Sequence, residues 1–156
     1  MASMNLERLS LNDLPQIQAL ESYTGQHAWA KHAYEMAFRA GWPVLGATID
    51  GGLVAVLVYQ VAGDQCSLLN VVVAQEHQGQ GHARALLEHL ITLAEQANCD
   101  SVFLEVREDN LRAVSLYESF GFSVINTRPG YYEYQGHRVT GLDMALALGM
   151  DGLFNL

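Results

Sequence analysis

Basic residues are scarce in this chain: 8 Lys and Arg stand against 17 Asp and Glu, which gives a formal net charge of −9. Binding to the phosphates of DNA or RNA requires clustered Lys and Arg side chains. The charge balance therefore argues against a nucleic-acid-binding protein. An acidic surface would attract a cationic peptide, although it also serves solubility alone.

Cysteine is nearly absent, and no metal-ligating pattern occurs. Cys66 and Cys99 are the only two cysteines, and they lack the CxxC spacing of a metal or redox site. Both lie in apolar sequence, which predicts two small core residues in a reducing compartment. The 6 histidines form no HExxH or similar spacing, so we expect no bound metal.

Long hydrophobic runs are also missing. The longest aliphatic run, Leu53 to Val58, is far shorter than the roughly 20 residues that cross a membrane. The N-terminal segment has no basic region followed by an apolar stretch, so we expect no signal peptide. These absences predict a cytoplasmic protein that does not bind membranes.

The remaining pattern indicates a mixed α/β fold. Hydrophobic residues make up 50% of the chain and charged residues 16%, as in packed globular proteins. Periodicity and turn signals predict the order βααβββαβαββ. We expect one central, mostly antiparallel twisted sheet flanked by about four helices. Residues 1–148 should form a single domain and residues 149–156 a C-terminal tail.

The element boundaries follow from caps, turns and apolar spacing. Asn12 is predicted to cap the first helix and Asn110 the last, and Gly121 to end the last helix. An aromatic loop is predicted over 130–134. The predicted strands are 6–9, 44–49, 53–61, 66–73, 101–106, 123–128 and 140–146, and the predicted helices are 13–23, 30–40, 82–97 and 111–120.

The stretch 70–84 joins an apolar β-rich segment to the longest amphipathic helix through a turn with two glycines. The first N–H groups of a helix lack internal acceptors, and the helix dipole is positive there, so such a turn suits a diphosphate. A P-loop would need a Lys that is missing, and Arg84 stands where the dinucleotide fingerprint needs its third glycine. What remains is Gln-x-x-Gly-x-Ala over Gln78–Ala83, or glycines that merely let strand and helix pack closely.

Other segments of the sequence help to interpret this turn. They are Leu104–Arg107, Asn110, Ala113 and the run Leu-Tyr-Glu-Ser-Phe-Gly-Phe over 116–122. With the turn at Gln78–Ala83, and with this spacing, they resemble the Gcn5-related N-acetyltransferase (GNAT) family. The resemblance reaches from the first strand to about Leu148. It implies a GNAT fold and transfer of acetyl from acetyl-CoA to an amine.

Within the family, the resemblance is strongest to enzymes that acetylate the N-terminal alanine of a small-subunit ribosomal protein. Arg128-x-x-Tyr131-Tyr132 and Asp143–Leu146 add to it. The implied partner is therefore a protein N-terminus. Gly79 and His82 depart from the family pattern, which more often has a basic and an apolar residue at these positions.

Acetyl transfer to an amine needs a base, oxyanion donors and an acid. An α-amino group with a pKa of about 7.7–8.0 is mostly protonated at neutral pH, the thioester oxygen gains charge, and the thiolate accepts a proton. By resemblance Glu105 is the base and Tyr117 the acid. For Glu105 the alternatives are a solvated carboxylate at the strand end or an ion-pair partner of Arg107, and for Tyr117 the alternative is a core tyrosine.

The resemblance also implies the ligand contacts. The backbone near Val73 would supply the oxyanion donor, and Trp29, Tyr131 and Tyr132 would line the acceptor groove, unless they only anchor the core and the loop. Glu133 would receive a basic acceptor residue. The implied acetyl-CoA contacts are Val71, Val72, Val73, Gln78, Gly79, Gln80, Gly81, His82, Ala83, Arg84 and Asn110.

Two other functions remain open. The same chemistry would suit a small amine, such as a polyamine or an aminoglycoside. A non-catalytic regulator that binds acyl-CoA is the second alternative. The presence of both Glu105 and Tyr117 argues against the regulator.

Overall fold

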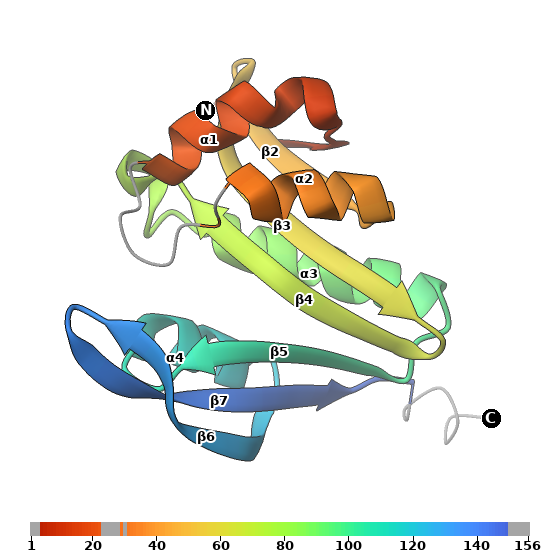
Figure 1. The fold of residues 1–156 in the computed structure, drawn as a ribbon. Helices are drawn as coiled ribbons and strands as arrows, with labels where there is room; N and C mark the ends of the chain where they lie inside the picture. Colours follow the sequence, from red (N-terminus) through yellow and green to blue (C-terminus); the bar gives the residue numbers. More distant parts are fainter. Residues whose placement is uncertain (1–3, 23–28, 30, 150–156) are drawn as a thin grey trace. The chain divides into compact units, whose positions relative to one another are not determined.

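The computed structural model describes residues 4–22, 29 and 31–149, and the predicted element order is confirmed (Figure 1). Among these residues, none of the helices has the length and apolar character needed to cross a bilayer. The strands are β1 Asn5–Arg8, β2 Val44–Ile49, β3 Gly52–Ala62, β4 Gln65–Val73, β5 Ser101–Arg107, β6 Ser123–Tyr134 and β7 His137–Ala147. The helices are α1 Leu14–Ser22, α2 Lys31–Ala40, α3 His82–Gln96 and α4 Leu111–Ser119, with short 3-10 turns η1 Leu11–Asp13 and η2 Gln75–His77.

The strands hydrogen-bond in the order β1-β2-β3-β4-β5-β7-β6. The β1–β2, β2–β3, β5–β7 and β6–β7 registers are antiparallel, and the β4–β5 register is parallel. The mostly antiparallel mixed fold is thus confirmed. The β4–β5 register covers only Gln65–Ser67 against Ser101–Phe103, whereas β5 stays paired with β7 as far as Arg107.

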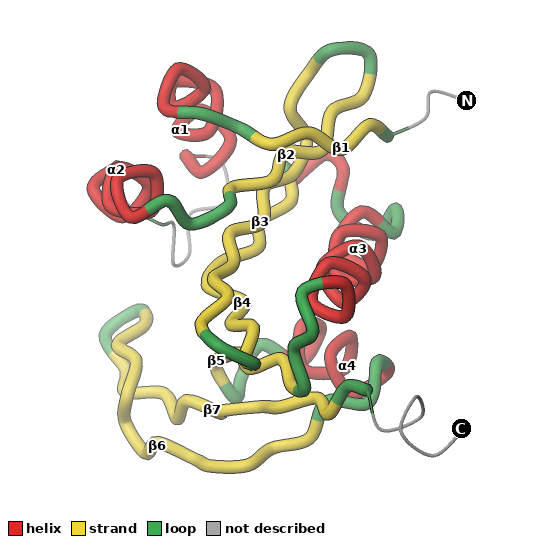
Figure 2. The backbone as a smooth tube through the Cα atoms, turned by 90° about the vertical axis from the view of Figure 1, so that its right-hand side faces the viewer, coloured by secondary structure: helices red, strands yellow, loops and turns green. Residues whose placement is uncertain are grey.

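The chain forms two compact units, and the first contains residues 1–60 and 69–90. Within it, α1 and α2 cover one face of β1–β3, and the start of α3 covers the other (Figure 2). Leu14, Ile17 and Leu20 recur at helical spacing on α1 and are buried. They pack in a core that includes Tyr34 and Val56.

The second unit contains residues 61–68 and 91–156. On β5, Val102, Leu104 and Val106 alternate into the core, so Glu105 points to the opposite face. Cys66 and Cys99 belong to this unit, and both are buried thiols. Their predicted role as core residues is confirmed.

Two local predictions were wrong. Asn12 lies inside η1. The N-cap of η1 is Ser10, whose backbone N–H donates to Asp13 Oδ2 at 2.8 Å. The aromatic run 130–134 is not a loop, since Tyr132 and Tyr134 pair with β7, as the strand preference of aromatic residues favours. The reversal comes later, at Gln135 and Gly136, which have φ of 51° and 78°.

Of the other predicted helix ends, the cap at Asn110 is confirmed and two lie outside the described residues. The Asn110 side chain caps α4 by accepting a hydrogen bond from the Ala113 N–H at 3.3 Å, as predicted. The predicted end of the first helix at Tyr23 lies outside the described residues, as does Ala30 at the predicted start of the second helix.

Candidate active site

The turn before α3 is shaped by two glycines and braced by two glutamines. Gly79 and Gly81 have φ of 77° and 87°, a conformation that other residues adopt only with strain. The Gln78 side chain donates to the Val73 carbonyl at 3.1 Å, and Gln80 donates to the Glu76 carbonyl at 3.3 Å. Gln78 thereby ties the turn to the last residue of β4.

This turn has the features of an anion site. The N–H groups in the first turn of α3, at His82 and Ala83, have no acceptor within the helix, and the dipole is positive there. The His77 and His82 rings lie edge to face, with centroids 5.8 Å apart. Nδ1 of His77 is buried and has no hydrogen-bond partner within the described part of the chain. A diphosphate would fit this donor set.

Val71, Val72 and Val73 end strand β4 and are half-buried. The chain then turns at Ala74, whose N–H donates to the Val54 carbonyl at 2.8 Å. The β4–β5 register stops before these valines, at Ser67. Their main chain is the part of β4 that could pair with an extended ligand.

Glu105 belongs to a charged cluster on the β5–β7–β6 sheet. It is exposed and stands opposite Asp143 in the register. Arg128 Nη2 lies 3.6 Å from Glu105 Oε1, and Arg128 Nε donates to Asp143 Oδ2 at 2.9 Å. Asn126 also donates to Asp143 Oδ2, at 3.0 Å. These hydrogen bonds from Asn126 and Arg128 lower the pKa of the Asp143 carboxyl.

The sequence left open an ion pair between Glu105 and Arg107 as an alternative to the base role. Arg107 Nε instead lies 2.8 Å from Asp109 Oδ1, and its guanidinium carbon lies 3.8 Å from the centroid of the Tyr134 ring. The partner of Glu105 comes from β6 because the β6–β7 hairpin brings Arg128 opposite Gly141.

Tyr117 is buried on α4 with 6% of its surface exposed. Its ring packs edge to face against Phe122, with centroids 5.8 Å apart. Burial raises the pKa of the Tyr117 hydroxyl to about 12, so the group stays protonated and able to donate a proton at neutral pH. The contacts of the described residues do not include one between Tyr117 and Glu105.

Tyr131 and Tyr132 form a T-shaped pair on β6, with ring centroids 5.0 Å apart. The Arg128 guanidinium carbon lies 5.0 Å from the Tyr131 centroid, so Arg128 joins this pair to Glu105. Burial, followed by the charge of Glu105, raises the pKa of Tyr132 to about 12. A Cβ at Gly141 would lie 3.0 Å from Tyr132 Cε2, so a larger residue there would require the ring to shift.

In the other unit, Trp29 has partners that sequence reasoning missed. Its backbone N–H donates to Glu21 Oε2 at 2.8 Å, and its ring lies edge to face with the Tyr34 ring, with centroids 5.2 Å apart. Glu21 follows Leu14 by seven residues and Ile17 by four, so it falls on the buried stripe of α1. A charged residue at the spacing of the buried apolar residues was the sequence signal that could have identified Glu21. Arg128 and Asp143 were singled out only as parts of the family resemblance, and no local signal indicated that their side chains would meet.

Metal ligands do not gather anywhere in the described residues: no group of three or more His, Cys, Asp or Glu side chains is arranged to hold an ion.

Comparison with known families decides what kind of enzyme carries this site. The profile described as the acetyltransferase (GNAT) family matches residues 8–122. The chain belongs to the GNAT family. It is therefore an N-acetyltransferase, and GNAT enzymes take the acetyl group from acetyl-CoA.

Several GNAT relatives match over almost their whole length. The [ribosomal protein bS18]-alanine N-acetyltransferase of Escherichia coli strain K12 is 32% identical over 145 residues, which cover 93% of this chain and 98% of that protein. The enzyme of the same name from Salmonella typhimurium is 34% identical over 143 residues, or 91% and 96% of the two chains. The crystal structure of the Escherichia coli ribosomal-protein-S18-alanine N-acetyltransferase matches with a TM-score of 0.88, 33% identity and 99% coverage of both chains.

Proposed function

We propose that this GNAT enzyme acetylates the N-terminal α-amino group of a protein, namely the N-terminal alanine of small-subunit ribosomal protein bS18. The observation that carries the proposal is the end-to-end similarity to bS18-alanine N-acetyltransferases, at 32% identity over 98% of the Escherichia coli enzyme. On this proposal residues 1–148 work as one acetyltransferase domain in the cytoplasm, where ribosomal proteins are made. The net charge of −9 favours a basic acceptor.

The donor would bind along the end of β4 and the turn that follows. We assign the diphosphate of acetyl-CoA to the turn Gln78–Arg84, with the backbone N–H groups at the start of α3 as donors. The acetyl-pantetheine arm would pair with the main chain of Val71–Val73. A backbone N–H near Val73 would stabilise the oxyanion. Asn110 would contact the coenzyme in addition to capping α4.

Glu105 would act as the general base. It is exposed, so it can reach an acceptor amine directly or through a water molecule. Removing a proton from the α-ammonium gives a neutral amine that attacks the thioester carbon. The attack leaves an extra proton on nitrogen, which is lost to water. The bond from the carbon to sulfur then breaks, and the electron pair leaves on the coenzyme thiolate.

Tyr117 would protonate that thiolate, since its pKa of about 12 keeps the hydroxyl protonated. We assign direct transfer in a ternary complex. Cys66 and Cys99 are buried, and burial raises the pKa of both thiols. A thiol with a raised pKa is a poor nucleophile at neutral pH, so neither is suited to carry the acetyl group covalently.

Trp29, Tyr131 and Tyr132 would bind the first residues of the acceptor. Aromatic rings give a large contact area for a flexible peptide. Glu133 would receive a basic side chain further along the acceptor, although Arg138 stands opposite it in the β6–β7 register.

The test is an acetylation assay with acetyl-CoA and peptides that carry the bS18 N-terminal sequence but differ in their first residue, analysed by mass spectrometry. We expect the alanine peptide to react fastest. A polyamine and an aminoglycoside serve as small-amine acceptors in the same assay. Faster acetylation of either one than of every peptide would replace the proposal with the small-amine alternative.

A further inference from the structure

Glu21 is a buried carboxylate that the proposed reaction does not use. Only 5% of its surface is exposed, and it is the one polar or charged residue in the buried class among residues that the structure describes. Placing a carboxylate in a core opposes folding unless hydrogen bonds compensate. A core position without a specific task would be filled as well by an apolar side chain.

Three donors from three parts of the first unit converge on Glu21 Oε2. The Trp29 N–H lies 2.8 Å away, the Tyr34 hydroxyl of α2 3.1 Å and the Asn70 Nδ2 of β4 3.5 Å. Asn70 Nδ2 also donates to the Tyr34 hydroxyl at 2.9 Å. The Tyr34 hydroxyl therefore accepts from Asn70 and donates to Glu21, which makes a closed network.

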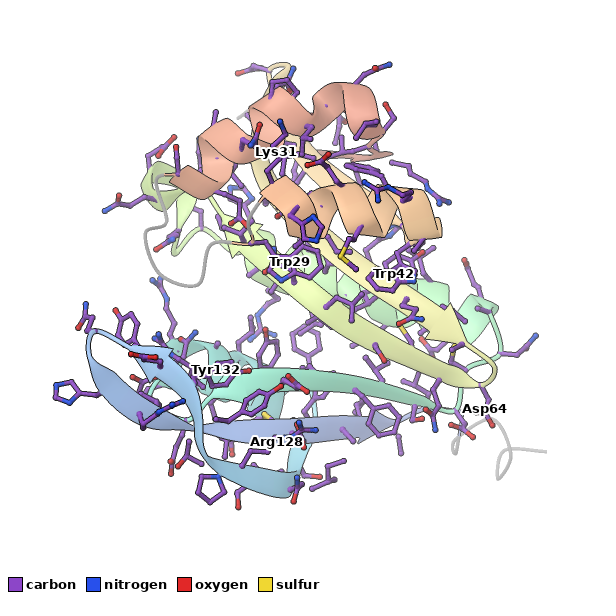
Figure 3. The ribbon with its side chains drawn as sticks, viewed as in Figure 1. Trp29, Lys31, Trp42, Asp64, Arg128 and Tyr132 are labelled. Atoms are coloured by element: carbon purple, nitrogen blue, oxygen red, sulfur yellow. The ribbon has the colours of Figure 1, made fainter. Side chains whose placement is uncertain are left out.

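The network reaches two residues, Trp29 and Asn70, that lie at or beside positions proposed to bind the substrates of acetyl transfer. Trp29, which lies just before α2 (Figure 3), is fixed by its N–H on Glu21 and by its ring on Tyr34. Asn70 immediately precedes Val71, where the proposed acetyl-pantetheine strand begins. One carboxylate thus joins a proposed acceptor wall to the strand proposed to hold the donor.

We infer that Glu21 is a positioning residue for the acceptor: it holds Trp29 in the place where the first residues of the peptide bind. The inference rests on the proposed function, because it assigns an acceptor contact to Trp29. Glu21 itself touches neither substrate, and it acts through the Trp29 backbone.

The experiment compares Glu21→Ala, Glu21→Gln and the control Gln18→Ala, an exposed position on the same helix. Steady-state rates are measured with acetyl-CoA and the bS18 N-terminal peptide. For Glu21→Ala we expect the KM for the peptide to rise by about tenfold, because the Trp29 N–H loses its acceptor. The KM for acetyl-CoA should stay within about twofold, as expected for a change confined to acceptor binding.

Glu21→Gln keeps an oxygen that can accept from Trp29, so it should restore most of the peptide affinity. Gln18→Ala should change neither constant. An unchanged peptide KM in Glu21→Ala, or an equal rise in both KM values, would overturn the inference, since an equal rise indicates only a loosened fold. If Glu21→Ala does not fold, Tyr34→Phe decides, because it removes the bridging hydroxyl and keeps the ring. It should raise the peptide KM selectively, and an unchanged value would again overturn the inference.

A second readout does not depend on turnover. In a Trp42→Phe background Trp29 is the sole tryptophan, and its fluorescence quenching by iodide reports its exposure. We expect Glu21→Ala to increase the quenching. If the wild-type enzyme acetylates no peptide, the proposed function fails, while unchanged quenching would reject the role of Glu21 whatever the substrate is.

Discussion

Arg128 lies 3.6 Å from the Glu105 carboxylate while it donates to Asp143 at 2.9 Å. Asp143 anchors the guanidinium, and the pKa of Arg128 is raised by this hydrogen bond and by the charge of Asp143. Arg128 therefore presents a fixed positive charge to the proposed base. The arrangement orients Glu105 without burying it.

Replacing Arg128 by Gln should lower kcat by about three- to tenfold, because Glu105 loses the partner that orients it. The free energy of unfolding should change little, since the pair of Arg128 and Glu105 is exposed to solvent. Arg112→Gln, at an exposed position of α4, is the control for loss of one positive charge. A wild-type kcat in Arg128→Gln would show that the pair has no part in catalysis.

Glu105→Gln removes the proposed base and keeps the size of the side chain. We expect kcat to fall by about 100-fold or more, the range that general bases contribute. Acetyl-CoA affinity, measured by calorimetry, should be unchanged because Glu105 is assigned no contact with the coenzyme. Turnover at the wild-type rate would remove Glu105 from the mechanism.

Tyr117→Phe removes the proposed acid. Release of the coenzyme thiol, followed with a thiol-reactive dye, should slow by about 100-fold or more, while acetyl-CoA still binds. Ser115→Ala on the exposed side of α4 is the control. Thiol release at an undiminished rate would leave Tyr117 as a core residue only.

Gly81→Ala tests the phosphate turn. Gly81 and Gly136 both have positive φ, 87° and 78°. A Cβ added at either position would have no other group within 4 Å. Each substitution should therefore lower stability by a similar amount, about 1 kcal/mol, through backbone strain. Only Gly81→Ala should weaken acetyl-CoA binding, and equal affinities in the two variants would contradict the assignment.

Stability should depend on pH through Glu21. Burial raises the pKa of this carboxyl above its ordinary value of 4.5, so above that pH the folded chain retains a proton that the unfolded chain has lost. The unfolding free energy of the wild-type protein, relative to Glu21→Gln, should therefore be highest below pH 4.5 and fall as the pH rises. Urea denaturation of both proteins between about pH 4 and pH 8 measures this difference. A difference that is flat or that grows with pH would contradict the sign.

Local sequence signals predicted most of the fold. The strand Val44–Ile49, the start of α3 at His82 and the Asn110 cap were all predicted, because short-range spacing and turn residues determine them. The aromatic run 130–134 was predicted to be a loop, whereas its pairing with β7 continues the strand.

The networks around the site could not be predicted in the same way. Asn70 lies 49 residues from Glu21 in sequence, and no local pattern joins them. The Arg128 pair with Asp143 likewise depends on the register of two strands. Family resemblance supplied the proposed donor turn, base and acid, but not the side chains that contact them.

The central claim is transfer of acetyl to a protein N-terminus, and it is tested most directly with two bS18 N-terminal peptides, one with a free and one with a blocked α-amino group, each containing a lysine. After incubation with acetyl-CoA and the enzyme, fragmentation in a mass spectrometer locates the added acetyl group. The account predicts acetyl on the α-amino group of the free peptide and no reaction of the blocked one. Acetylation of the lysine in both peptides would contradict it.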